Sequence, residues 1–202
     1  MLNAKAAFLR NVADARNLSG LYDYLTSTVS VPFPFDDLLR AQIVYTLSAY
    51  DKLVHDVIRI GMVQIFTGRR PATDRYLAET LTMEVHSRLV GASIPPKEII
   101  FEREVFRKLS FLSFQDPQKL VHGLALIWPE QQKWSRIAAV LNITTEDART
   151  KMNLVATRRN AIVHEADIDF LTFSKRPISR AECNDITKFV EDCGNAIVSL
   201  VN

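Results

Sequence analysis

The spacing of apolar residues is the feature that most constrains the fold of this chain. Apolar side chains recur every three or four residues along almost its whole length, and no convincing stretch alternates apolar with polar residues. Spacing of this kind gathers side chains on one face of a helix, whereas alternation is typical of a strand. The sequence therefore predicts an all-α fold in which amphipathic helices pack into a bundle.

Length and composition favour a single domain of this class. The chain has 202 residues, of which 48% are hydrophobic and 24% charged, as in ordinary globular proteins. Only 6 glycines and 8 prolines are present, which leaves little room for a turn-rich β-sandwich. We expect one helical domain over residues 1–202, with a possible helical insertion at about 73–96.

Charge and cysteine content limit where the protein works and what it binds. The net charge is only +2, so a nucleic-acid site must come from local clustering of cations. Cys183 and Cys193 lie ten residues apart, which matches no zinc or thioredoxin pattern and favours a reduced, cytoplasmic setting. Charges interrupt every long apolar stretch, and residues 1–16 resemble an amphipathic helix more than a signal peptide. We therefore expect a cytoplasmic protein with no membrane partner.

The first half of the chain predicts two long helices. The first is expected at about 2–26, and Pro32 and Pro34 end it. Asp36 is a good N-cap for the second, at 37–66. Polar gaps along this second helix are narrow, so it should be covered on several sides and lie at the centre of the bundle.

The second half predicts shorter helices and two capped ones. Helices are expected at about 73–89, 97–113, 117–126 and 129–141, the last with Pro129 in its first turn. A hydroxyl residue followed three residues later by an acid occurs at Thr144 and again at Ser179. This capping-box pattern predicts a helix to about Glu165 and a final helix to about Leu200.

The segment from Arg158 to Asp167 differs from the rest because polar residues surround its short apolar core. At 100° per residue, Asn160 and His164 lie about 40° apart on one helix face. Arg159 lies about 140° from His164, so the two converge only through the long arginine side chain, a frayed helix end or a second subunit. Alternatively, His164 is a structural histidine at a helix C-terminus, where the dipole favours it.

These residue types suit RNA cleavage. Histidine takes and gives a proton near neutral pH, so His164 is a candidate to act on the 2′-hydroxyl or on the leaving 5′-oxygen. The guanidinium of Arg159 can hold the scissile phosphate, and Asn160 can orient the phosphate or the imidazole. No carboxylates accompany them at metal-ligand spacing. We therefore expect a reaction that needs no metal and no cofactor.

The pattern Arg159-Asn160-x-x-x-His164 resembles the Arg-x(4–6)-His motif of the HEPN superfamily. Residues 134–141 and 158–167 are similar to the RiboL-PSP type of HEPN domain, as are residues 39–55 on the long helix. The resemblance spans about Asp36 to Leu200 and is strongest in these blocks.

This resemblance implies an antiparallel helical bundle that forms a homodimer, with paired arginines and histidines in one cleft. Many members are metal-independent endoribonucleases in toxin–antitoxin, phage-defence or RNA-processing systems, and others are inactive binding modules. We therefore predict an endoribonuclease acting on RNA, with a possible cognate antitoxin or regulatory protein as partner. The alternative is an inactive HEPN module that binds nucleotide, RNA or a protein.

Other polar residues are candidates to support this site. Asp51 and His55 stand four apart on the long helix and either line the cleft or satisfy each other as a buried pair. Arg40 is either a further cleft residue or simply a first-turn charge, and we favour the second interpretation. The tentative RNA-binding cations are Arg158, Lys175, Arg176 and Arg180.

Overall fold

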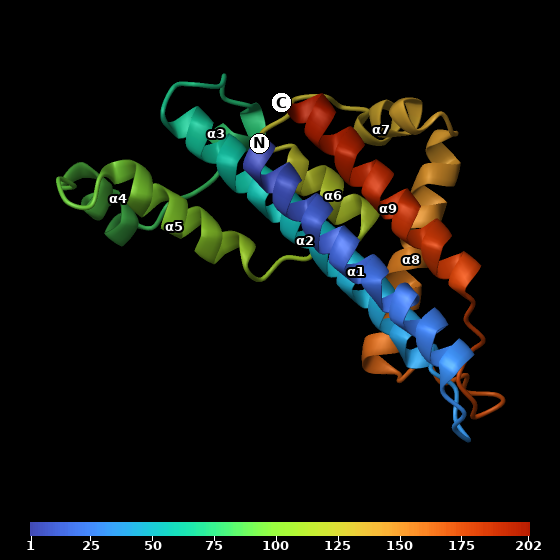
Figure 1. Ribbon diagram of the computed structural model, residues 1–202. Coiled ribbons are helices and arrows are strands. Elements are labelled where there is room, and N and C mark those ends of the chain that lie inside the picture. Colours follow the sequence, from blue (N-terminus) through green and yellow to red (C-terminus); the bar gives the residue numbers. More distant parts are fainter.

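The computed structural model describes residues 1–202 and consists of helices joined by loops (Figure 1). Its elements are α1 (Leu2–Thr28), α2 (Asp36–Phe66), α3 (Asp74–Leu77), α4 (Met83–Val90), α5 (Lys97–Leu109), α6 (Pro117–Leu124), α7 (Lys133–Leu141), α8 (Thr145–His164) and α9 (Arg180–Val201). A single isolated bridge between Ile168 and Lys175 is the only β-type pairing. The predicted all-α fold class is confirmed.

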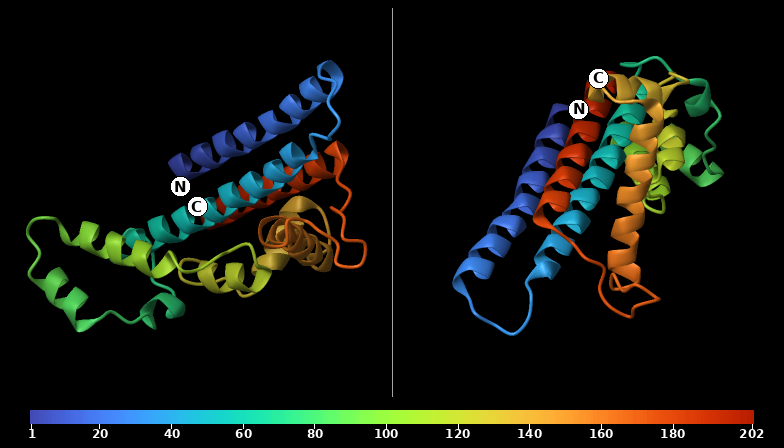
Figure 2. Two further views of the ribbon diagram at one scale, coloured as in Figure 1. Left: turned by 90° about the horizontal axis from the view of Figure 1, so that it is seen from below. Right: turned by 90° about the vertical axis from the view of Figure 1, so that its right-hand side faces the viewer.

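Three long helices form the body of the molecule. α1, α2 and α9 lie side by side in both views of Figure 2, and α2 also contacts α5 and α8. The side chains of Leu39, Ile43 and Leu47 on α2 are fully buried. A Cβ atom at Gly194 of α9 would lie 2.5 Å from the Phe8 ring of α1, so the missing side chain lets these helices approach. The prediction that the second long helix forms the centre is confirmed.

The helices α3, α4 and α5 project to one side of this body (Figures 1 and 2). The prediction of one continuous helix over 73–89 is wrong, because the chain is non-helical between α3 and α4. The hydroxyl of Thr73 accepts a hydrogen bond from the amide of Tyr76 and caps α3. The hydroxyl of Thr82 accepts one from the amide of Val85 and starts α4 separately. Two capping residues in one stretch produce two short helices.

Several helix ends also differ from prediction. Asp36 lies within the first turn of α2, where Phe35 takes the N-cap position without a side-chain hydrogen bond. Pro129 lies outside α7, which begins only at Lys133. α5 and α6 end before residues 113 and 126.

The two helix starts predicted from capping-box patterns are confirmed, each with a side-chain N-cap. The amide of Asp147 donates to the hydroxyl of Thr144 over 3.0 Å at the start of α8. The amide of Glu182 donates to the hydroxyl of Ser179 over 3.2 Å at the start of α9. None of the helices combines the length and apolar character that crossing a membrane requires.

Candidate active site at the C-terminal end of α8

The predicted motif occupies the last two turns of α8. This end of the helix lies near the α1–α2 loop, at the end of the molecule opposite the chain termini (Figure 1). Asn160 and His164 are exposed, and Arg159 is half-buried. The Nη1 atom of Arg159 donates to the side-chain oxygen of Asn160 over 3.2 Å. Asn160 therefore fixes the neighbouring guanidinium on the same helix end.

Arg159 and His164 have no acidic partner within ion-pair distance, although acids are common in this region. The Nε atom of Arg159 is buried without a hydrogen-bond partner. His164 is the last residue of α8, and no side chain of the protein hydrogen-bonds its ring. A cation and an imidazole without an acidic partner in the protein remain available to an incoming anionic group.

The adjacent Arg158 is bound within the protein. Its Nη1 atom lies 2.9 Å from Oδ1 of Asp167, and its Nη2 atom donates to the carbonyl of Pro177 over 2.9 Å. The other carboxylate oxygen of Asp167 accepts a hydrogen bond from Nε of Arg40 over 2.7 Å. Asp167 is fully buried, so its charge is balanced by guanidinium groups from α2 and α8. We call Arg40, Arg158 and Asp167 the Asp167 cluster.

The backbone after α8 brings Asp167 into this position. Ala166 and Asp167 adopt positive φ values of 50° and 59°, a left-handed conformation that aspartate tolerates better than most residues. The amide of Asp167 then donates to the carbonyl of Ala161 over 2.9 Å, which closes the helix end. Arg40, interpreted from the sequence as simply a first-turn charge, is only 6% exposed and pairs with Asp167, so it has a structural role that its position did not indicate.

The other cations predicted to bind RNA have acidic partners. Lys175 donates to both carboxylate oxygens of Asp37, at 2.6 and 2.7 Å. Its ammonium lowers the pKa of Asp37 against the opposing effect of burial. Arg176 lies 3.8 Å from Glu165, and Arg180 lies 2.7 Å from Asp23. A phosphate near these side chains would compete with a carboxylate already in place.

Asp51 and His55 are directed to another part of the molecule. The Oδ1 atom of Asp51 accepts a hydrogen bond from the amide of Phe114 over 2.6 Å. The Nε2 atom of His55 lies 3.2 Å from the carbonyl of Leu112 and 3.6 Å from Asp51. The pair thus fastens the α5–α6 connection to α2. Neither residue hydrogen-bonds Arg159 or Asn160, so the structure does not join them to the motif.

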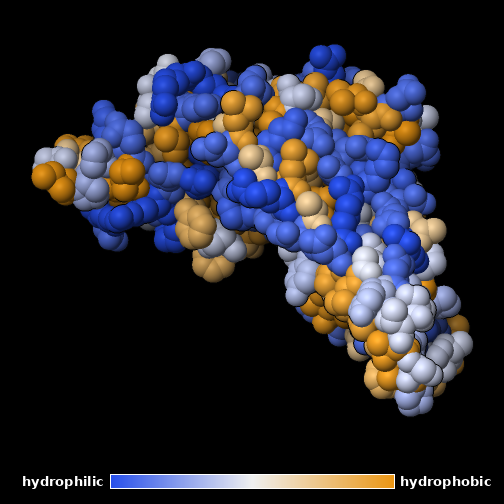
Figure 3. All heavy atoms as spheres, in the orientation of Figure 1, coloured by the Kyte–Doolittle hydropathy of each residue, from blue (hydrophilic) through white to orange (hydrophobic).

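In one copy of the chain the motif does not line any of the main surface hollows. The hollow nearest to it in sequence includes Leu154, Arg158 and Ile186 but not Arg159 or His164. Apolar side chains beside the motif are exposed, among them Phe170 at 74% and Phe173 at 83%. Orange atoms mark this end of the molecule, around the α1–α2 loop, in Figure 3. Nowhere in the chain do three or more His, Cys, Asp or Glu side chains gather in a metal-binding arrangement.

Comparison with known proteins yields one match. The family model described as RiboL-PSP-HEPN matches residues 10–202, a range that includes α2, α8 and the motif. Neither a curated protein nor a solved structure matches the chain.

Proposed function

The chain belongs to the RiboL-PSP-HEPN family, and from this premise we propose that it is a metal-independent endoribonuclease that acts as a homodimer. The observation that carries this proposal is the availability of Arg159 and His164. Both lie on the last turns of α8 without an acidic partner, whereas Arg158 beside them is paired with buried Asp167. A phosphodiester is the kind of ligand that such a cation and imidazole can receive without displacing a protein group.

Each motif residue has a distinct chemical role in this proposal. The Arg159 guanidinium holds the scissile phosphate and offsets the charge that develops on its oxygens. Asn160 keeps that guanidinium in place through its hydrogen bond. The imidazole of His164 transfers a proton, either from the attacking 2′-hydroxyl or to the leaving 5′-oxygen. The 2′-oxygen attacks phosphorus, the bond to the 5′-oxygen breaks, and a cyclic phosphate and a 5′-hydroxyl result.

A second copy of the chain would supply what one copy lacks. Arg159 and His164 point about 140° apart around α8, and one copy offers no hollow around them. Two α8 ends across a two-fold axis would bring two arginines and two histidines to one cleft. The exposed rings of Phe170 and Phe173 lie in the loop that follows α8, and such a contact would cover them. We place this activity in the cytoplasm, in defence, toxin–antitoxin or RNA processing, with an antitoxin or regulatory protein as possible partner.

One observation favours a second candidate function. In a single copy no main hollow surrounds the motif. The second proposal is therefore an inactive module that binds nucleotide, RNA or a protein partner. Such a module would retain binding that weakens with salt if phosphates are involved, but would cut no RNA.

The deciding experiment measures RNA cleavage by the purified protein with EDTA present. We expect cleavage by the wild type and a loss of about 10²–10⁴-fold for His164→Ala, because proton transfer contributes that much. The matched control is His86→Ala on α4, since His86 is also exposed and has no acidic partner. It should cleave at the wild-type rate, and both variants should keep the wild-type stability and assembly.

Equal cleavage by His164→Ala and wild type would contradict the assignment of this residue. Failure of the wild type to cut any RNA, with RNA binding retained, would favour the inactive module.

A further inference from the structure

The helix α8 is basic beyond its first turn. Its acids, Glu146 and Asp147, lie at the N-terminus, where their negative charge interacts favourably with the helix dipole. From Ala148 to His164 the helix carries no aspartate or glutamate. An anionic polymer along this helix therefore meets no carboxylate of α8 itself after the first turn.

One exposed stripe runs the length of α8. Arg149, Asn153, Thr157, Asn160 and His164 are all exposed and lie within about 80° of one another at 100° per residue. Their side chains are cationic or uncharged hydrogen-bonding groups. The stripe begins at Arg149 and ends at the proposed catalytic residues.

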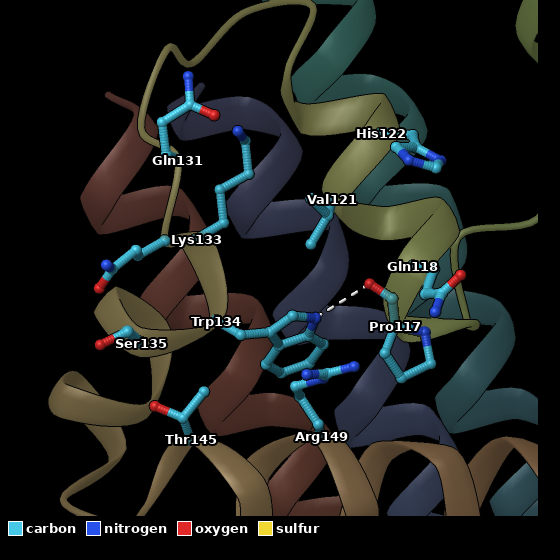
Figure 4. Close-up of a pocket in the computed structure, with 11 residues that line it drawn as sticks. Pro117, Gln118, Val121, His122, Gln131, Lys133, Trp134, Ser135, Thr145 and Arg149 are labelled. Atoms are coloured by element: carbon cyan, nitrogen blue, oxygen red, sulfur yellow. Dashed lines mark hydrogen bonds between the residues drawn. The ribbon is translucent and has the colours of Figure 1, made fainter.

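At its Arg149 end the stripe meets a polar hollow between α6, α7 and α8 (Figure 4). The hollow has a volume of about 450 Å³, and no carboxylate lines it. Figure 4 shows Lys133 and Arg149 on opposite sides of the Trp134 indole, with Gln118 and His122 facing them from α6. Cationic groups and hydrogen-bond donors in a lining without carboxylates suit an anion.

The cations of this hollow lack ionic partners. The side chain of Lys133 is only 4% exposed, and its ammonium donates to the carbonyl of Glu130, not to a carboxylate. Burial lowers the pKa of Lys133 against the opposing effect of the Glu130 charge, so its ammonium is incompletely solvated. No acid lies within ion-pair distance of Arg149, unlike Arg136 of α7, which lies 3.7 Å from Glu130. A bound phosphate would offset the cost of holding these charges away from water.

We propose that single-stranded RNA lies along the exposed stripe of α8 and places one of its phosphates in the hollow beside Lys133 and Arg149. This inference rests on the proposed function, because it extends the RNA away from the cut site at His164. Fifteen residues separate Arg149 from His164, which corresponds to about 22 Å along a helix. At 3.4 Å per nucleotide of a stacked strand, the hollow holds a phosphate about six nucleotides from the cut.

The continuity of the stripe favours RNA over a free phosphate compound as the occupant. The hollow alone has the size of a small-ligand site. The stripe, however, joins the hollow to the motif without an intervening acid of α8. A strand of RNA would contact the whole stripe, whereas a small ligand in the hollow would contact only its Arg149 end.

The test measures binding of 2′-O-methyl RNA, which lacks the hydroxyl that cleavage requires. We compare Arg149→Gln with Arg10→Gln, which removes the same charge from an exposed position on α1 without an acidic partner. Arg149→Gln should weaken binding about tenfold, as loss of a charged hydrogen bond does. It should also reduce the slope of log K against log salt by about 0.7, the share of one phosphate on a single strand. Arg10→Gln should change neither quantity.

RNA length gives the second readout. The Arg149→Gln effect should be absent for RNAs of about 4 nucleotides and present at about 12, because only the longer strands reach from the motif to the hollow. An effect that does not depend on length, or one equal to that of Arg10→Gln, would overturn the proposed path. So would weakened binding of inorganic phosphate to Arg149→Gln with unchanged RNA affinity, because the hollow would then be a small-anion site.

Binding and cleavage separate this inference from the proposed function. If the wild type cuts no unmodified RNA but Arg149→Gln still weakens binding of long strands, the catalytic proposal fails and the path stands. If the wild type cuts RNA but the two variants bind alike, the path fails and the catalytic proposal stands.

Discussion

Arg158 and Arg159 are neighbours in sequence, yet they belong to two regions of opposite character. Arg158 enters the Asp167 cluster, where a fully buried carboxylate is shared with Arg40 of α2. Arg159 is half-buried, and its single side-chain hydrogen bond is to uncharged Asn160. The two residues are of the same type and adjacent in the chain, and they differ in their partners. Arg158 pairs with a buried carboxylate and holds the fold, whereas Arg159 has no acidic partner and can bind a ligand.

The position of the motif depends on the Asp167 cluster. The Asp167 cluster ties the segment after α8 to the first turns of α2, so the last turn of α8 has a fixed position. A motif on a firmly held helix end loses little conformational freedom when a ligand binds. The cluster is therefore a support for the motif, although none of its members needs to touch the substrate.

The largest expected effects come from replacing each of the two arginines, and the comparison fails if the two variants exchange their effects on cleavage and stability. Arg159→Gln should lower RNA cleavage by about 10²–10³-fold, the usual loss on removal of a group that stabilises the transition state. Its free energy of unfolding should change by less than about 1 kcal/mol, because half-buried Arg159 has no ion pair to lose. Arg158→Gln should do the opposite and destabilise the fold by about 1–3 kcal/mol. Cleavage assays with urea unfolding of both variants provide the measurements.

Asp167→Asn tests the cluster from its acidic side. Removing the carboxylate leaves Arg40 buried beside a neutral amide, and loss of one partner from a buried pair costs about 3–5 kcal/mol. We expect the urea midpoint to fall accordingly. The control is Asp169→Asn, two residues along, whose carboxylate accepts only local hydrogen bonds from Leu171 and Thr172. Equal loss in both variants would show that the buried pairing is not what fixes the end of α8.

The helices of both regions could be read from the sequence, because their signals are local. The hydroxyl-and-acid pairs at Thr144 and Ser179 predicted the starts of α8 and α9, and the apolar spacing predicted the central α2. The break before α4 was missed because the hydroxyl of Thr82 looked like one polar position on a continuous helix. Helix periodicity continues through such a position, and only the hydrogen bond shows that a new helix begins there.

Partnership between distant residues could not be read from the sequence. Arg40 and Asp167 are 127 residues apart, and nothing in the spacing of either one indicates the other. The spacing of the motif already favoured Arg159 over Arg158 as its arginine, but the pairing of Arg158 with Asp167 could be found only from the coordinates. The left-handed turn at Ala166 and Asp167 had one local signal, an aspartate three residues after the end of α8.

The smallest effect concerns the exposed rim of the cluster, where Lys175 pairs with Asp37 and Arg40 also reaches the same carboxylate. These contacts hold the pKa of Asp37 below its usual value, so the unfolded chain binds a proton more readily than the folded one. The stabilisation is therefore full above the unfolded pKa of about 4 and is lost as the pH falls through the lower folded value. Because Asp37 is 69% exposed, solvent limits its pairing with Lys175 to less than about 1 kcal/mol.

A double-mutant cycle of Asp37→Asn and Lys175→Gln measures this pairing directly. The coupling energy from urea unfolding should be positive at about pH 7, shrink toward about pH 3 and decrease with salt. Asp36→Asn with Lys175→Gln is the matched cycle, since Asp36 shares the first turn of α2 but has no ion pair with Lys175. A coupling that persists at low pH would mean that the rim is held by packing and not by charge. The charge of Lys175 would then contribute little to the fold, and Lys175 would resemble Arg159 more than Arg158.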